Sequence, residues 1–99
     1  MVDVIEVRQT AVFRNWMNDL RDVHAVARIN ARIRRLSLGN FGDVKPVGEG
    51  VGELRIDYGP GYRVYFVQRG TEIVILLCGG DKKSQRGDIR DAKSMAKEL

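Results

Sequence analysis

Cationic side chains and one tyrosine recur at alternate positions in the second half of this 99-residue chain. Arg55 and Arg63 lie in two neighbouring segments that alternate polar and apolar residues, and Tyr65 follows Arg63 by two positions. Lys82 and Lys83 come directly after a nearly all-apolar segment. Cations bind phosphates and an aromatic ring stacks on an unpaired base, so these side chains could together hold a splayed-out nucleotide.

The turn at residues 59–61 predicts how two of these segments pair. Its Gly-Pro-Gly sequence is typical of a turn, and the alternation on either side predicts an antiparallel hairpin. Because opposite residues share one face of a sheet, a three-residue turn would place Asp57 opposite Arg63. Arg55 would then lie opposite Tyr65. The alternative is a solvated sheet face on which Asp57 and Arg63 form a surface ion pair, worth about 0.2–1 kcal/mol.

A further strand is expected at residues 72–78, because a nearly all-apolar sequence is typical of a central strand. A two-residue turn at residues 69–70 would place Leu76 opposite Arg63. The face of the sheet that carries Arg55, Arg63 and Tyr65 is expected to be concave, and residues 81–83 would emerge beside Arg63. In this register the face beneath the helices carries Tyr62, Val64, Phe66, Ile73, Ile75 and Leu77.

The first half of the chain is expected to supply helices that cover the sheet. A short strand is expected at residues 2–7, followed by an amphipathic helix over 11–20 with Thr10 as its N-cap. Asp22 would cap a second helix, which Gly39 would end. The two helices would form a tight antiparallel hairpin, and the second would bury a stripe of Val26, Ile29, Ile33 and Leu36.

The order of elements predicts an α+β fold. Residues 44–47 are expected to form a short edge strand containing Pro46, and Ser84 is expected to cap a last helix. The predicted order is therefore β-α-α-β-β-β-β-α, with an antiparallel meander, in a single domain over residues 1–99. Arg28, Arg32 and Arg35 line one flank of the second helix, where they could contact RNA, dock a protein partner or simply face solvent.

Composition excludes several classes of protein. The chain is 43% hydrophobic and 30% charged, which is typical of a globular domain. It has no apolar run of the roughly 20 residues that a membrane span needs, one cysteine and no Cys/His cluster for zinc. No signal peptide is recognised, so the cytoplasm is the expected compartment. The net charge of +4 suits a nucleic acid or an acidic protein partner, and equally suits solubility alone.

Three segments together resemble a known family. These are LGNFGDVKPV at residues 38–47, ELRIDYGPGYRVYF at 53–66 and LLCGGDKKSQ at 76–85. They resemble the addiction-module killer proteins, a branch of the RelE/HigB-like toxins of bacterial type II toxin–antitoxin modules, and the resemblance covers essentially the whole chain.

The resemblance implies a microbial-ribonuclease-like fold, in which a helical hairpin covers one face of an antiparallel sheet and a C-terminal helix follows. It also implies cleavage of mRNA, usually on the translating ribosome, with no cofactor and no metal. The implied partner is a cognate antitoxin, typically of the helix-turn-helix type, which neutralises the toxin and represses the shared operon. Operator DNA would then be contacted only through the antitoxin.

The resemblance also assigns roles to cationic residues. Arg63 matches the best-defined catalytic arginine of RelE-type toxins, and Arg55 falls on a basic strand position of theirs. Lys82 falls where those toxins carry a second arginine or lysine, as a phosphate clamp. The expected catalytic residues are therefore Arg63, Arg55 and Lys82, and the expected nucleic-acid-binding residues are Lys45, Tyr65, Lys83 and Arg86.

Two positions depart from the family pattern. Glu53 stands where RelE has a lysine assigned as a base, and Asp88 falls near a tyrosine that stacks on the substrate. Metal-free RNA cleavage needs a base for the 2′-hydroxyl, an acid for the leaving 5′ oxygen and cations for the phosphorane. His24, the only histidine, is expected at the start of a helix without a catalytic role.

The base could therefore be Asp57, Glu53, Asp81, a lysine whose pKa neighbouring cations lower, or a group of the ribosome. A site without a strong base would be slow on free RNA and would benefit from a ribosome that orients the mRNA. The loss of the lysine at position 53 leaves a second interpretation open. In it, the protein binds RNA, the ribosome or its antitoxin without cutting.

Overall fold

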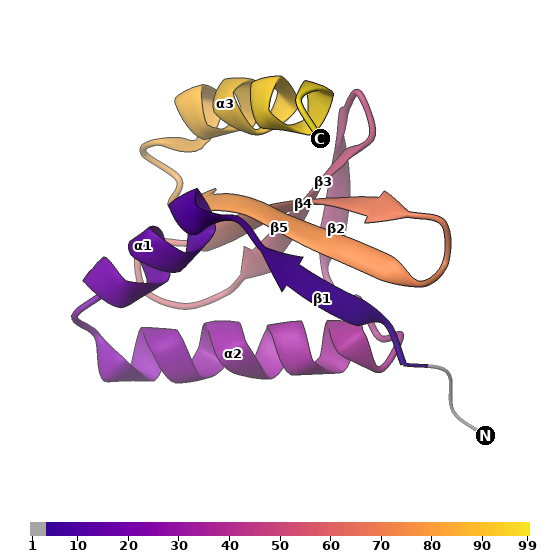
Figure 1. Cartoon of the computed structure of the whole chain (residues 1–99). Helices are drawn as coiled ribbons and strands as arrows, with labels where there is room; N and C mark the ends of the chain where they lie inside the picture. Colours follow the sequence, from indigo (N-terminus) through magenta and orange to yellow (C-terminus); the bar gives the residue numbers. More distant parts are fainter. Residues whose placement is uncertain (1–3) are drawn as a thin grey trace.

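A five-stranded sheet lies between two layers of helices in the computed structural model, which describes residues 4–99 (Figure 1). The α+β class and the predicted order of elements are confirmed. The elements are β1 (Glu6–Gln9), α1 (Ala11–Asp19), α2 (Val23–Ser37), β2 (Val44–Gly48), β3 (Val51–Ile56), β4 (Tyr62–Arg69), β5 (Ile73–Gly80) and α3 (Gln85–Lys97).

The sheet has the strand order β1-β5-β4-β3-β2. Strands β2 to β5 form the expected antiparallel meander, and the apolar strand β5 is internal. Strand β1 pairs with β5 in the parallel direction, with Val7 opposite Val74, so the sheet is mixed and not wholly antiparallel. None of the helices within residues 4–99 is long and apolar enough to cross a membrane.

The first strand lies later in the chain than the expected residues 2–7. Residues 2–3 fall outside the described part of the chain, and the strand begins at Glu6. Ile5 is buried, and its N–H donates to the carbonyl of Ser37 at the end of α2 (2.8 Å). Because that N–H is bound to a helix end, the segment joins the sheet only after Ile5.

Side-chain caps begin the first two helices as predicted. The hydroxyl of Thr10 accepts a hydrogen bond from the N–H of Phe13 (3.0 Å) and donates to the carbonyl of Leu77 (2.6 Å). Asp22 accepts from the N–H groups of residues 24–25. Each cap satisfies N–H groups that a helix leaves unpaired at its start. The chain reverses direction between α1 and α2 (Figure 1).

The predicted end of α2 is confirmed, but the predicted cap at the start of α3 is wrong. Gly39 follows α2 with φ of 91°, the left-handed conformation that ends a helix. Ser84 makes no side-chain cap to α3. Instead, the carboxylate of Asp81 accepts from the N–H groups of residues 83–84 (2.8 and 3.2 Å). Asp81 therefore orders the turn that leads from β5 into α3.

The buried face of α2 is rotated from the predicted stripe. Ile29 and Leu36 are buried as expected, but Val26 and Ile33 are only half-buried and Ala25 is fully buried. The rotation brings Arg32 from the expected flank into partly buried contact with the neighbouring backbone.

The register between β3 and β4 differs by two residues from the prediction. Arg55 lies opposite Arg63, and Glu53 lies opposite Tyr65. The connecting loop spans residues 57–61, two more than expected, which moves Asp57 out of the strand pair. A shift of two preserves the face on which each side chain lies, because side chains alternate with a period of two.

The predicted register between β4 and β5 is wrong. Phe66 lies opposite Leu76, where the prediction implies Ile73, and this shift of three residues exchanges the faces of β5 in that part of the strand. Arg63 lies opposite Gly80 and not Leu76, and a bulge interrupts the pairing after Tyr65. As a result Leu76 faces α1 and α2, and Leu77 faces α3. A one-residue slip always turns a strand over, and an apolar strand tolerates either orientation when both faces are covered.

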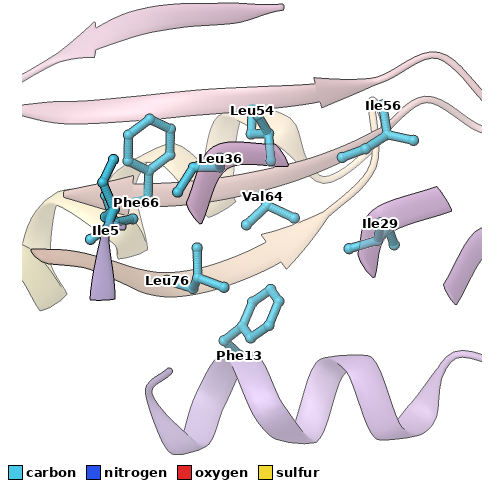
Figure 2. Close-up of a cluster of buried hydrophobic side chains, with 10 residues drawn as sticks. Ile5, Phe13, Ile29, Leu36, Leu54, Ile56, Val64, Phe66 and Leu76 are labelled. Atoms are coloured by element: carbon cyan, nitrogen blue, oxygen red, sulfur yellow. The ribbon is translucent and has the colours of Figure 1, made fainter. Parts of the chain in front are cut away.

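Each face of the sheet has its own core. Figure 2 shows the cluster beneath α1 and α2, which contains Ile5, Phe13, Ile29, Leu36, Leu54, Ile56, Val64, Phe66, Val74 and Leu76. The second cluster, between the sheet and α3, contains Val51, Tyr65, Val67, Leu77, Cys78 and Ala92. The face expected to be concave therefore packs against α3.

Candidate functional site

A cavity of about 330 Å³ opens where the β3–β4 loop meets the end of β5. The three cations predicted to be catalytic, Arg55, Arg63 and Lys82, all line it. The cavity is completed by Asp43, Ile56, Asp57, Tyr58, Gly59, Pro60 and Gly61. Residues far apart in the sequence thus contribute three cationic groups to one small space.

Local structure explains how each cation reaches the cavity. Arg55 and Arg63 are directly opposite each other on β3 and β4, and Arg63 pairs with Gly80 at the end of β5. Lys82 follows two residues later. Gly61, with φ of 79°, lets the lysine stem pass close by, because a Cβ there would lie 3.0 Å from the Lys82 side chain.

A buried carboxylate lies behind the two arginines. Glu53 is fully buried, and its Oε2 accepts hydrogen bonds from the hydroxyl of Tyr65 (3.0 Å) and the amide of Gln85 (2.8 Å). Its Oε1 accepts from Nε of Arg55 (3.2 Å) and lies 4.0 Å from Nε of Arg63. The carboxylate therefore connects β3, β4 and α3 and contacts two of the arginines that line the cavity.

The charge of Glu53 follows from these partners. Burial raises the pKa of a carboxyl group, but the donors Gln85, Arg55 and Tyr65 and the charge of Arg63 together hold the pKa of Glu53 below its usual range. Glu53 is thus ionised at neutral pH, and donors surround its oxygens. A carboxylate with this low pKa and no exposure is poorly suited to take a proton from a substrate.

Arg63 is a nearly buried cation, with 8% of its surface exposed. Among residues 4–99, its Nε has no hydrogen-bond partner, and Glu53 is the acid that forms an ion pair with it. The expected surface pair with Asp57 does not form in this part of the chain, because Asp57 has moved into the loop. A buried guanidinium that lines a cavity can interact strongly with an anion entering it, since little water competes.

Tyr65 does not offer its ring to a substrate, contrary to the prediction. Its side chain is fully buried between β4 and α3, and its hydroxyl is bound to Glu53. Burial and the neighbouring Glu53 charge raise the pKa of Tyr65 far above its usual value. Its role in this structure is to donate a hydrogen bond to a buried carboxylate.

Comparison with known proteins identifies the family. Residues 15–99 match the model of a family described as "Phage derived protein Gp49-like". The chain belongs to this Gp49-like family. It is also 53% identical over 95 residues to an uncharacterized protein of Haemophilus influenzae, a match that covers 96% of each chain.

Among solved structures, this Gp49-like chain resembles one in the toxin–antitoxin complex RelBE2 of Mycobacterium tuberculosis. The TM-score is 0.53 with 18% identity, over 83% of this chain and 95% of the other. At that identity the likeness establishes the fold. The expected likeness to a RelE-type toxin is confirmed at the level of the fold.

The remaining residues predicted to bind nucleic acid lie outside the cavity of the Gp49-like chain. Lys45 is exposed on β2, opposite Glu53 in the register. Lys83 is exposed, and its N–H is bound to Asp81. Arg86 lines a separate groove along α3, with Glu49, Ile89, Arg90, Lys93, Ser94 and Lys97.

The candidate bases have different locations and contacts in the structure. Asp57 is exposed and lines the cavity, whereas Asp81 is used to order the turn before α3. His24 is exposed at the start of α2 and does not line the cavity. Within the part of the chain that the structure describes, no group of three His, Cys, Asp or Glu side chains could hold a metal ion.

Sequence reasoning missed the structural role of Arg32. Its guanidinium donates to the carbonyls of Phe41 (3.1 Å), Asp43 (3.3 Å) and Arg55. Burial lowers the pKa of Arg32, as expected for a cation enclosed by backbone. The position of Arg32 three residues after Ile29, on the half-buried flank of the helix, was the available signal.

Arg28, on the same flank of α2, has a different contact. Its guanidinium carbon lies 4.7 Å from the ring centre of Tyr58, in the β3–β4 loop. The hydroxyl of Tyr58 donates to Asp22 (2.9 Å). This flank therefore holds the loop that forms one wall of the cavity.

Proposed function

We propose that this Gp49-like protein is the toxin of a type II toxin–antitoxin module, which acts in the cytoplasm by cleaving mRNA on the ribosome. The observation that carries the proposal is the convergence of Arg55, Arg63 and Lys82 on one cavity. The cavity suits an RNA phosphate, because arginine binds phosphate oxygens through its planar fork and lysine adds a point charge.

The proposed reaction is attack of a ribose 2′-oxygen on the adjacent phosphorus. A 2′,3′-cyclic phosphate forms as the bond from phosphorus to the 5′-oxygen breaks, and the 5′-oxygen leaves as a hydroxyl after it takes up a proton from water or from the group that accepted the 2′-proton. The phosphorane gains negative charge, and Arg63, Arg55 and Lys82 stabilise it without a metal ion. One well-placed donor of this kind contributes about 10²–10³-fold to a rate. Arg63 contributes most in this proposal, since it is the least exposed of the three.

The residues of this site are less well suited to proton transfer than to stabilising a phosphate. Glu53 is surrounded by donors, so Asp57 or a group of the ribosome would accept the 2′-proton in the proposed mechanism. General acid–base help contributes about 10²–10⁴-fold, and a site with little of it depends on orientation of the substrate. Dependence on the ribosome is consistent with this chemistry.

A cognate antitoxin is part of the proposal. The fold is shared with a chain of a toxin–antitoxin complex, which supports a partner of that kind. In the proposal the antitoxin is of the helix-turn-helix type, neutralises the toxin and contacts operator DNA for both proteins.

A second candidate function is a module that binds RNA, the ribosome or the antitoxin without cutting. The buried carboxylate at Glu53 and the buried ring of Tyr65 favour it, because neither position supplies a base or a stacking surface. The two candidates share the cationic cavity and differ in whether mRNA is broken.

Induced expression without antitoxin, followed by mapping of mRNA 5′ ends, tests the proposal. We expect growth arrest and new codon-phased 5′ ends with the wild-type chain. Arg63→Ala should abolish both, and Arg69→Ala, at the exposed far end of β4, should abolish neither. Arrest without new 5′ ends would favour the non-cleaving module, and full toxicity of Arg63→Ala would refute the site.

A further inference from the structure

We infer that Glu53 is a positioning residue, which Tyr65 and Gln85 orient so that it fixes the guanidiniums of Arg55 and Arg63 in the cavity. The inference rests on the proposed function for its effect on cleavage. Its structural part, the order of the Arg63 side chain, can be tested without any activity. The juxtaposition that carries it joins residues of β3, β4 and α3.

The two oxygens of Glu53 have separate partners. Oε2 receives the neutral donors of Tyr65 and Gln85, which fixes the plane of the carboxylate from the side of α3. Oε1 accepts a hydrogen bond from Nε of Arg55 (3.2 Å), and Nε of Arg63 lies 4.0 Å from it in an ion pair without a hydrogen bond. A guanidinium that uses only Nε keeps the four N–H groups of its terminal nitrogens available, and both arginines line the cavity. This geometry anchors the cations without occupying the groups that would bind a phosphate.

The negative charge of Glu53 also offsets the repulsion between the two arginines. Arg55 and Arg63 are directly opposite each other, and like charges in that relationship destabilise a sheet. Arg63 is nearly buried, where an uncompensated charge is costly. Without the negative charge of Glu53, we expect the Arg63 guanidinium to leave this position for solvent or to become disordered.

Gln85 connects the C-terminal helix to this arrangement. It is the first residue of α3 and does not line the cavity, yet its amide donates to Glu53 at 2.8 Å. A change at Gln85 should therefore reach the arginines only through Glu53. The competing role for Glu53, acceptance of the 2′-proton, is opposed by its full burial and its complement of donors.

The test compares wild-type protein with Glu53→Gln, which preserves shape and removes the charge. A ¹⁵N–¹H spectrum of the arginine Nε groups should show a dispersed, slowly exchanging Arg63 signal in the wild type. In Glu53→Gln that signal should move to the position of solvated arginines. In ribosomes programmed with mRNA, kcat should fall about tenfold to hundredfold, as for a displaced catalytic group. KM should not rise, because one negative charge near the substrate phosphates is gone.

Gln85→Ala is the second variant, in case Glu53→Gln does not fold. It should broaden or shift the Arg63 signal and lower kcat, and Gln68→Ala, at an exposed position of β4, should change neither. A folded Glu53→Gln or Gln85→Ala protein with unchanged Arg63 signal overturns the inference. So does a loss of the pH dependence of kcat in Glu53→Gln with Arg63 still ordered, which would identify Glu53 as the base.

The two proposals fail in different ways. If the wild-type chain does not cleave mRNA, or if Arg63→Ala cleaves normally, the proposed function is wrong while the spectra still test the positioning of Arg63. If cleavage depends on Arg63 and Glu53→Gln retains the wild-type kcat, the positioning role alone is wrong.

Discussion

The guanidinium of Arg32, on α2, donates a hydrogen bond to the main-chain carbonyl of Arg55, on β3. The same side chain also donates to the carbonyls of Phe41 and Asp43, in the segment that leads into β2. Asp43 in turn accepts from the N–H of Arg55 through its carbonyl (3.0 Å). One helix residue therefore holds together the backbone segments that place Arg55 in the cavity.

We expect Arg32→Lys to destabilise the protein. A lysine has one nitrogen and cannot reach three carbonyls in the planar arrangement of a guanidinium. Leaving part-buried carbonyls without a donor costs about 1–3 kcal/mol. Urea unfolding at neutral pH measures the loss. Arg34→Lys, at an exposed position of the same helix, is the matched control, and an equal loss in both variants would contradict the role of Arg32.

Tyr65→Phe should lower the free energy of unfolding by about 1–3 kcal/mol, because it removes a donor from a buried carboxylate. Tyr58→Phe removes a similar hydrogen bond, to Asp22, at the surface, and should cost much less. Urea unfolding of both variants makes the comparison. A loss in Tyr58→Phe as large as that in Tyr65→Phe would show that burial does not set the value of these bonds.

Asp88 should make the protein less stable at neutral pH than it would be with a neutral side chain. Burial raises the pKa of Asp88, and the charges of Asp91 and Asp81 add to this, although a hydrogen bond from Ser84 (2.5 Å) opposes it. Because the folded-state pKa exceeds the ordinary value of 3.8, this group contributes stability below that pH and loses the contribution as pH rises through the folded-state pKa.

Asp88→Asn is the corresponding test. The melting temperature of the variant should exceed that of the wild type at pH 7, and the two should converge as the pH falls below about 4, where the wild-type carboxyl is protonated. Asn can still accept the hydrogen bond from Ser84. Thermal melts between pH 3 and pH 8 provide the measurement. A variant that is less stable at pH 7 than at acid pH, relative to the wild type, would reverse the predicted sign.

Gly79→Ala should be destabilising by about 1–3 kcal/mol, the usual cost of forcing an extra group into a packed core. A Cβ at Gly79 would overlap ring carbon Cε3 of Trp16, on α1. At Gly87, within α3, a Cβ would have room, because its nearest neighbour, Nη2 of Arg90, would be 3.7 Å away. Gly87→Ala should therefore stabilise the helix by roughly 0.5–1 kcal/mol. Thermal and urea unfolding of the pair would show opposite signs, and two losses would refute the argument.

Local patterns in the sequence determined much of this structure. Thr10 and Asp22 cap their helices because capping involves only residues two or three positions away. The meander and the order of the elements follow from the alternation of apolar residues and from the turns between them. The convergence of Arg55, Arg63 and Lys82 was also predictable, because each is tied to the end or the face of its own strand.

The tertiary structure alone decided how those strands are offset and what covers them. Alternation with a period of two assigns faces within a strand, but it leaves the offset between strands to loop length and bulges. The offset placed Glu53 opposite Tyr65, and α3 then closed over both and added Gln85. In the sequence, Glu53 is recognised only as a departure from the lysine that RelE has at the matching position. Glu53 is buried among four partners, Arg55, Arg63, Tyr65 and Gln85, which come from three separate elements. This burial is a property of the folded chain, since no local pattern brings those elements together.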